Sequence, residues 1–396
     1  MKTFRTRSLF IFSLSVIWLT SCEPWNLEKR EDHDFNPFET LIDEDRDLEA
    51  YGITNTHDGG YIVVGAIWNT DKTKRDIYIV KVDAADTKSW GHALEADDND
   101  DKYGTAITMT SDNGFLIAGH KDVGGSDWQM HVVKVNQSGN LSWPFTDGIT
   151  PGTDESYSVV QKSDNKYYVL GNTDGFSQSY GIETLIIEFT ENAGNFTKRY
   201  LYLNLAGDGM DDYGHSIIET AEGDLVFLAT YKNDIDNYDL RVVKLAENEL
   251  SIPGLPVPSW DNIIMQNCQK INACVKQVSD GGFVAVGASS GDRLQLVKIK
   301  ADGSVDWSKP YSNSNAGTAA SVIQTEDGGY ALLSSGMTLI KTGPTGTLQM
   351  QKDFNGTCKG NNCLLQSPDK GLIITGTTEN NDIFIRKIFP GNVAGK

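Results

Sequence analysis

A turn followed by an alternating apolar strand recurs seven times along the chain. The first copy reads Asp58-Gly59-Gly60 and continues into the apolar run 61–65. The turn acids of the seven copies are Asp58, Asp112, Asp164, Glu222, Asp280, Asp327 and Asp369. The segments after the turns alternate with period two and are rich in Val, Ile, Tyr and Phe, which is typical of β-strands. Because glycine adopts positive φ at little cost, each turn predicts a tight hairpin.

Each copy contains four strand signals. One leads into the turn, as in Ser321–Thr325, and the second follows it. The third has a recurrent form, seen in Asp76–Val82 and Asp382–Ile388, and the fourth often holds an aromatic residue, as in Gly303–Trp307. Four strands per unit, repeated seven times, predict an all-β fold: a single seven-bladed β-propeller over residues 35–390, followed by a tail at 391–396.

Two positions of the repeat support this alignment of the seven copies, because a small residue occupies each of them in every copy. Six residues before the turn acid stand Gly52, Ala106, Ser158, Ser216, Cys274, Ser321 and Cys363. Seven residues after it stand Gly65, Gly119, Gly171, Ala229, Gly287, Ser334 and Gly376. We interpret both sets as positions on strands that crowd near a propeller axis.

The last copy ends near Ile388 with three strand signals only. We expect the missing fourth strand to come from residues 36–42 near the N-terminus. Pairing the two ends of the chain in this way would remove two unpaired strand edges.

The D-G-G-[YF] turns and the strands after them resemble the repeats of secreted and lipid-anchored bacterial β-propellers over about residues 36–388. The third and fourth copies depart from the pattern, since the third lacks both glycines and the fourth reads Glu222-Gly223-Asp224. The design is also similar to the outer-membrane assembly lipoprotein called factor B. That resemblance concerns the design alone. We separately expect a protein-binding or scaffolding role as an accessory of a larger envelope assembly, with a protein partner in the outer membrane or periplasm.

The N-terminal residues have the form of an export signal. Basic residues at Lys2, Arg5 and Arg7 precede the apolar run 9–18, which is short for a membrane span. Residues 19–22, Leu-Thr-Ser-Cys, resemble the lipobox of bacterial lipoproteins. The resemblance implies a signal peptide over 1–21, lipidation of Cys22 and a polar tether over 22–34. We therefore expect a lipid-anchored protein of the outer membrane, facing the periplasm or the cell exterior.

Charge narrows the choice of partner. The formal net charge of -20 argues against nucleic-acid binding, because such a surface repels phosphate. Several expected fourth-to-first loops are acidic and predict a docking face for a basic partner; its candidate residues are Asp97, Asp98, Asp100, Asp101, Asp208, Asp211 and Asp212. Calcium held by residues 97–101 is an alternative, although the glycine spacing of an EF-hand is missing. The loop acids Asp154 and Glu155 form a further acidic stretch. A tyrosine follows each of the three stretches, and a carbohydrate-binding platform is an alternative interpretation of them: Tyr103, Tyr157 and Tyr213.

Four cysteines remain besides Cys22, as two pairs close in sequence. An exported protein meets an oxidising environment, and neither pair has the C-x-x-C spacing of a zinc site. We therefore predict two disulfides, Cys268–Cys274 and Cys358–Cys363.

No catalytic constellation emerges from the sequence. Residues 367–371 match half of a sialidase box without its tryptophan, and the six histidines fall at different positions of the repeat. We predict no catalytic residues, no resident metal and no cofactor, hence a non-catalytic binding propeller. The alternative left open is a surface glycan-binding protein or a carbohydrate-active enzyme, because carboxylate pairs are abundant.

Overall fold

The computed structural model describes residues 38–94, 100–125, 127–149, 152–162, 166–175, 181–192, 194–203, 210–234, 237–250, 256–268, 272–289, 293–312 and 318–389. The expected signal peptide, the lipidation site Cys22, the tether up to residue 34 and the tail 391–396 lie outside these ranges.

The described chain is built almost entirely from strands that run in sequence order. The first half contains β1 (Phe38–Ile42), β2 (Leu48–Asn55), β3 (Tyr61–Trp68), β4 (Arg75–Val82), β5 (Lys88–Leu94), β6 (Lys102–Met109), β7 (Phe115–Asp122), β8 (Trp128–Val135), β9 (Leu141–Asp147), β10 (Asp154–Gln161), β11 (Tyr167–Thr173), β12 (Glu183–Asn192) and β13 (Asn195–Leu203). The fourth group adds β14 (Asp212–Glu219), β15 (Leu225–Asp234), β16 (Asn237–Leu245), the short helix α2 (Glu247–Leu250) and β17 (Trp260–Cys268).

The second half repeats the same order. It contains β18 (Cys274–Gln277), β19 (Phe283–Ser289), β20 (Arg293–Ile299), β21 (Val305–Tyr311), β22 (Ala319–Gln324), β23 (Tyr330–Ser334), β24 (Thr338–Thr342), β25 (Leu348–Asp353), β26 (Leu364–Gln366), β27 (Leu372–Thr377) and β28 (Ile383–Ile388). The strand pairs in both halves are antiparallel, as the hairpin turns predict.

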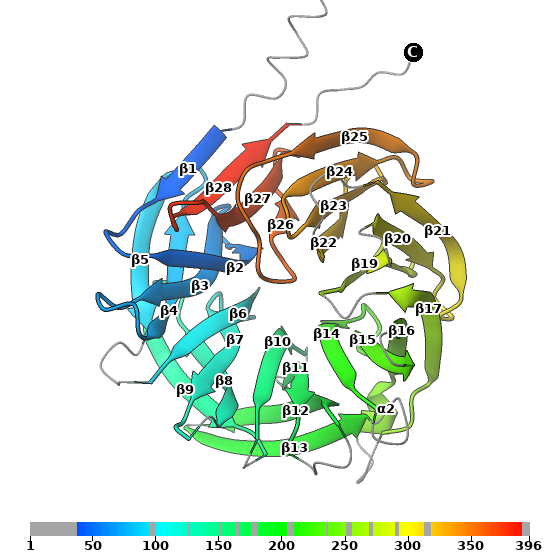
Figure 1. Ribbon diagram of the computed structural model, residues 1–396, viewed down its shortest axis with the longest axis horizontal. Coiled ribbons are helices and arrows are strands. Elements are labelled where there is room, and N and C mark those ends of the chain that lie inside the picture. Colours follow the sequence, from blue (N-terminus) through cyan, green and yellow to red (C-terminus); the bar gives the residue numbers. More distant parts are fainter. Residues whose placement is uncertain are drawn as a thin grey trace, which may run out of the picture.

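These strands form five four-stranded sheets and one eight-stranded sheet. Figure 1 shows the sheets arranged around a common axis, with the first strand of a group innermost and the fourth on the rim. The eight-stranded sheet consists of β14–β17 and β18–β21, joined through the single pair Cys268↔Ser289. The all-β propeller architecture predicted from the repeats is confirmed, as is the antiparallel four-stranded group.

Strand β1 completes the last four-stranded sheet. It pairs antiparallel with β28, from Phe38↔Lys387 to Ile42↔Ile383. Ile42 is buried in a cluster that also holds Leu48 of β2 and Ile373 of β27. The two ends of the described chain therefore share one sheet and one core cluster, and the predicted pairing of the N-terminal segment with the last strand is confirmed.

The core lies between neighbouring sheets. Ile62 and Ile79 of the β2–β5 sheet pack against Ile107 and Ile117 of the β6–β9 sheet, and similar clusters recur around the axis. Sheets covered on both faces explain why the second and third strands are nearly continuous in apolar residues. Burial between sheets holds each sheet in place through its neighbours.

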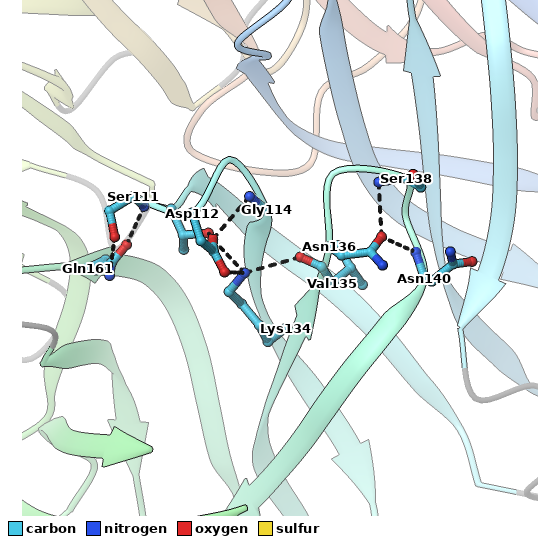
Figure 2. Close-up of polar contacts among 10 residues, drawn as sticks. Ser111, Asp112, Gly114, Lys134, Val135, Asn136, Ser138, Asn140 and Gln161 are labelled. Atoms are coloured by element: carbon cyan, nitrogen blue, oxygen red, sulfur yellow. Dashed lines mark hydrogen bonds and ion pairs between the residues drawn. The ribbon is translucent and has the colours of Figure 1, made fainter. Parts of the chain in front are cut away.

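A lysine on the third strand locks the first hairpin of most groups. In the β6–β9 sheet, Lys134 Nζ lies 2.9 Å from both carboxylate oxygens of Asp112 and donates to the carbonyl of Val135 at 3.2 Å (Figure 2). The same aspartate accepts from the Thr110 hydroxyl and from the Gly114 amide at 3.1 Å. Equivalent ion pairs are Lys81–Asp58, Lys298–Asp280, Lys341–Asp327 and Lys387–Asp369.

A glutamine at the end of an inner strand links one four-strand group to the turn of the preceding group. Gln161 Oε1 accepts from the Ser111 amide at 2.8 Å (Figure 2). The same bond joins Gln277 to Ala221, Gln324 to Ser279 and Gln366 to Glu326. Each glutamine stands three residues before the turn acid of its own group, so one residue ties two neighbouring four-strand groups together.

The turn lock yields a stability prediction. The Lys134 side chain is 5% exposed, so Asp112→Ala leaves a buried ammonium without its carboxylate. We expect the free energy of unfolding to fall by about 2 kcal/mol. Chemical denaturation measures this loss, with Asp71→Ala in the β3–β4 loop as the exposed control. The double variant Asp112→Ala/Lys134→Met should recover most of the stability; an equal loss in both variants would contradict the buried-charge explanation.

The pairing of β1 with β28 gives a second prediction. Deleting residues 35–42 exposes the hydrogen-bonding edge of β28 and uncovers the apolar surface around Ile383 and Ile385. We expect lower thermal stability and concentration-dependent association, because an unpaired strand edge templates pairing with another chain. Size-exclusion chromatography and thermal denaturation measure both. A deletion variant that stays monomeric with unchanged melting would show that β1 contributes little.

Candidate functional site

The inner strands share a β-bulge at one level. The pairing register shifts between Ala50 and Gly52 in β2, and it shifts at the equivalent point in β6, β10, β14 and β22. A bulge inserts one extra residue and re-aims its side chain. In β2, β6 and β10 the extra residues are Tyr51, Thr105 and Tyr157, and all three line one cavity.

The bulge also explains the second set of small residues. Gly65, Gly119 and Gly171 lie opposite the bulges on the second strands. A Cβ on each glycine would overlap the carbonyl oxygen of the residue that stands two positions before the bulged residue of the facing strand. These residues are Glu49, Tyr103 and Glu155, respectively. The small side chain is therefore required by the bulge of the neighbouring strand. Crowding at the axis, which we expected from the sequence, is not the reason at these positions.

Two cavities lie at the centre of the molecule. The channel-mouth pocket has a volume of about 100 Å³ and is lined by Tyr51, Tyr103, Thr105, His120, Tyr157, Lys359, Gly360 and Asn361. The axial cavity has a volume of about 350 Å³ and is lined by residues of five inner strands, with Thr105, Tyr157 and Asn361 shared between the two. The pocket therefore adjoins the axial cavity where the bulges lie.

Aromatic rings form one side of the channel-mouth pocket. The ring centroids of Tyr51 and Tyr103 are 5.4 Å apart, and His120 meets Tyr103 edge-on at 4.7 Å and Tyr157 at 5.8 Å. The guanidinium carbon of Arg75 lies 4.0 Å from the centroid of the Tyr103 ring. These contacts restrict the rings to one arrangement.

Carboxylates behind the rings are engaged within the protein. Glu49 accepts from the Tyr51 hydroxyl at 2.9 Å and pairs with Lys359 at 2.7 Å. Burial alone would raise the pKa of Glu49, but hydrogen bonding and charge from Lys359 lower it below its usual value. The Tyr157 hydroxyl donates to Glu155 in the same way. Burial and these carboxylates raise the pKa values of Tyr51 and Tyr157, so both phenols stay neutral.

His120 is neutral as well. Its side chain is buried, and its Nδ1 accepts from the Ser156 amide at 3.0 Å, which places the ring proton on Nε2. Burial, followed by the nearby charge of Arg75, lowers the pKa of His120 to about 3. A ring with so low a pKa is poorly matched to proton transfer near neutral pH.

A disulfide-closed loop, residues 354–363 between β25 and β26, crosses the axis. We call it the capping loop. The Asn361 amide donates to the His215 carbonyl at 2.6 Å, and Asn272 donates to the Lys359 carbonyl at 3.2 Å. On the opposite side Asn362 exchanges hydrogen bonds with Ile53 at 2.8 and 2.9 Å. In Figure 1 this loop reaches from the last sheet toward the centre. The capping loop thus joins the last sheet to β2, β14 and the segment before β18.

Of the two predicted disulfides, only one forms. Cys358 and Cys363 are bonded, with Cα atoms 6.5 Å apart. Cys268 and Cys274 are both buried free thiols, so the prediction of a bond between them is wrong. Cys268 packs with Ala273 and Val275, and because side chains alternate along a strand, Cys274 faces the other side. Sequence proximity concealed this difference in direction.

The predicted acidic docking face is only partly available to a partner. Asp101 binds Arg75 with both carboxylate oxygens, at 3.1 and 2.8 Å, and Asp212 is fully buried. Asp100 pairs with Lys121 and Asp211 with Lys232, while their side chains remain 40% and 27% exposed. The other three predicted residues, Asp97, Asp98 and Asp208, lie outside the described residues. Within the described ranges, no group of three or more His, Cys, Asp or Glu side chains is arranged to hold a metal ion.

Two buried carboxyl groups stand out near this face. Burial raises the pKa of Asp154 to about 6. Burial and the charges of Asp212 and Asp211 raise that of Glu183 to about 7. Asp154 belongs to an acidic loop noted in the sequence, but Glu183 begins an ordinary strand and nothing in its sequence context distinguishes it. Asn361 was not among the residues predicted from the sequence either.

Comparisons with known proteins support the fold. No protein-family profile and no curated protein sequence matches the chain. Among solved structures, it is similar to an inactive variant of virginiamycin B lyase from Staphylococcus aureus with quinupristin: 9% identity, 89% of this chain and 100% of that chain covered, TM-score 0.56. It is similar to the β-propeller domain of Cps50 (Swd1) from Myceliophteria thermophila: 12% identity, 89% and 100% covered, TM-score 0.56.

A protein of unknown function from Dyadobacter fermentans aligns with 9% identity, covering 89% of this chain and 98% of that chain, with a TM-score of 0.53. Structural similarity at such low sequence identity supports the propeller fold alone, so function has to be argued from the site itself. In the described part of the chain, no helix has the length and apolar character needed to span a membrane.

Glu183 generates a pH prediction. Its folded-state pKa lies above its unfolded value, so its protonated form stabilises the fold below about pH 4.5, and this stability is lost as pH rises through about 7. Glu183→Gln removes the buried charge, so its advantage over the wild type should grow between pH 5 and pH 8 by on the order of 2 kcal/mol after solvent screening. Chemical denaturation at both pH values measures it, with exposed Glu379→Gln as the control. An advantage independent of pH would contradict this assignment.

Proposed function

We propose that this protein is a non-catalytic binding propeller. It presents to a protein partner the face around the channel-mouth pocket, which includes Arg75, Asp100, Asp101 and Asp211 and which we call the channel-mouth face. The observation that carries the proposal is the electrostatic state of that face. Charged side chains of this face form ion pairs with each other, as in Arg75–Asp101 and Lys359–Glu49. Burial and the nearby charge of Arg75 lower the pKa of His120, which is therefore neutral. Such a face is rigid and specific in shape, which suits recognition better than proton transfer.

We further propose that the strand groups are seven blades and that β1 closes the ring as the outer strand of the seventh. The support is that β14–β17 and β18–β21 each repeat the inner-to-outer order of the other groups. Only one residue pair, Cys268↔Ser289, joins them. The β2–β5 sheet and the β1–β28–β27–β26 sheet also share a core cluster.

The proposed location is the outer membrane, through a lipid on Cys22, with residues 23–34 as a tether. The basic N-terminus, the short apolar run and the Leu-Thr-Ser-Cys sequence support this part of the proposal. Several acyl chains on one residue hold a protein firmly, since each buried methylene adds about 0.8 kcal/mol.

One experiment tests anchoring and binding together. Cells expressing the full chain are labelled with an alkyne fatty acid and extracted with detergent, and the protein is purified with its lipid. We expect label on the wild type, none on Cys22→Ala, and a stoichiometric membrane protein retained by the wild type.

Charge reversal then assigns the partner to a surface. Asp100→Lys/Asp211→Lys alters two acids of the predicted docking face whose side chains are 40% and 27% exposed. Asp302→Lys alters an exposed turn between a third and a fourth strand. We expect at least a tenfold loss of the partner with the first variant and none with the second. Equal retention by both variants would overturn the assignment to this face.

A further inference from the structure

Asn361 carries an unsatisfied hydrogen-bond acceptor in the middle of the molecule. Its side chain is 7% exposed, and its amide nitrogen is bonded to the His215 carbonyl at 2.6 Å. Its Oδ1 is buried without a hydrogen-bond partner. A buried acceptor left unpaired costs roughly 1–3 kcal/mol, so such a group is normally met by a bound donor.

The position of Asn361 indicates where that donor would lie. The residue lines both the channel-mouth pocket and the axial cavity. The position of Asn361 is restrained by its neighbours. The Cys358–Cys363 disulfide closes the capping loop, and Asn362 exchanges two hydrogen bonds with the backbone of Ile53. The acceptor is therefore part of a preorganised site, which lowers the cost of binding a ligand there.

The rest of the channel-mouth pocket selects against several ligand classes. The tyrosine hydroxyls of residues 51 and 157 already donate to Glu49 and Glu155. The Thr105 hydroxyl already donates to the carbonyls of Ala118 and Ser156, at 3.1 and 2.8 Å. Lys359 is paired with Glu49 at 2.7 Å. Ring surface, the Asn361 oxygen, the Tyr103 hydroxyl and the Nε2–H of His120 remain for a ligand. Neither a strong anion nor a strong cation therefore finds an uncompensated opposite charge.

We propose that the channel-mouth pocket binds the terminal ring of a neutral sugar. A pyranose has a C–H face that packs on the tyrosine rings and hydroxyl groups that donate to Asn361 Oδ1, which is the combination this pocket offers. The cavity of about 100 Å³ accommodates part of one sugar ring, whose C–H face lies on the tyrosines, and the remainder of a glycan stays outside. This site is independent of the protein-binding role proposed above.

Saturation-transfer difference NMR on the full-length protein tests the proposal with four probes: D-glucose, D-galactose, D-mannose and N-acetylglucosamine at millimolar concentration. We expect transfer to at least one of them. Asn361→Ser should lower the affinity for that sugar about fivefold to tenfold, which is the effect of losing one hydrogen bond. Tyr103→Leu should weaken it similarly by removing one ring. The exposed Asn140→Ser is the matched control and should bind as the wild type does.

Thermal denaturation of each variant separates loss of binding from loss of fold, and Tyr103→Leu keeps the site falsifiable if Asn361→Ser unfolds. No transfer to any of the four sugars by folded wild-type protein would overturn the proposal. A crystal structure with water alone on Asn361 Oδ1 after soaking in these sugars would overturn it as well. Partner capture in the charge-reversal experiment would remain intact in either case, so the two proposals fail separately.

Discussion

The ion pair between a buried third-strand lysine and the exposed turn aspartate is the interaction on which the architecture depends. It ties the first hairpin of a group to its third strand, and the same aspartate organises the turn through backbone amides. With that turn fixed, the glutamine three residues earlier is in place to bond the turn of the preceding sheet. The inner strand is thereby held at one end, and its bulge at the other end has a defined position.

One group lacks the lysine, and its turn differs as well. In the β10–β13 sheet, Glu188 stands at the position of the lysine and accepts from the Tyr168 hydroxyl at 2.6 Å and from Arg199 at 3.0 Å. This is the same copy whose turn lacks both glycines in the sequence. The lysine and the glycine-rich turn are thus replaced together, which is expected when the two act as one unit.

Much of the fold was predictable because strand alternation and turn chemistry are local properties. The seven turns, the four strand signals and the pairing of residues 38–42 with β28 all follow from such patterns. The site was less accessible. The tyrosines at positions 103 and 157 were noted, but the capping loop that brings Asn361 to them depends on contacts more than a hundred residues apart in sequence. The same limit applies to Cys268 and Cys274, whose opposite directions are set by sheet packing.

The glutamine bonds between sheets have a mechanical consequence. At the junction between the last and first sheets, the turn residue that would donate is Pro368, which has no amide hydrogen, and the next junction has Met109 in place of glutamine. A pulling force applied to the chain before Phe38 therefore acts on the five residue pairs between β1 and β28. These pairs lie next to a junction between sheets that lacks the glutamine hydrogen bond. Under tension the molecule should yield there first, releasing a short segment while the braced sheets keep their shape.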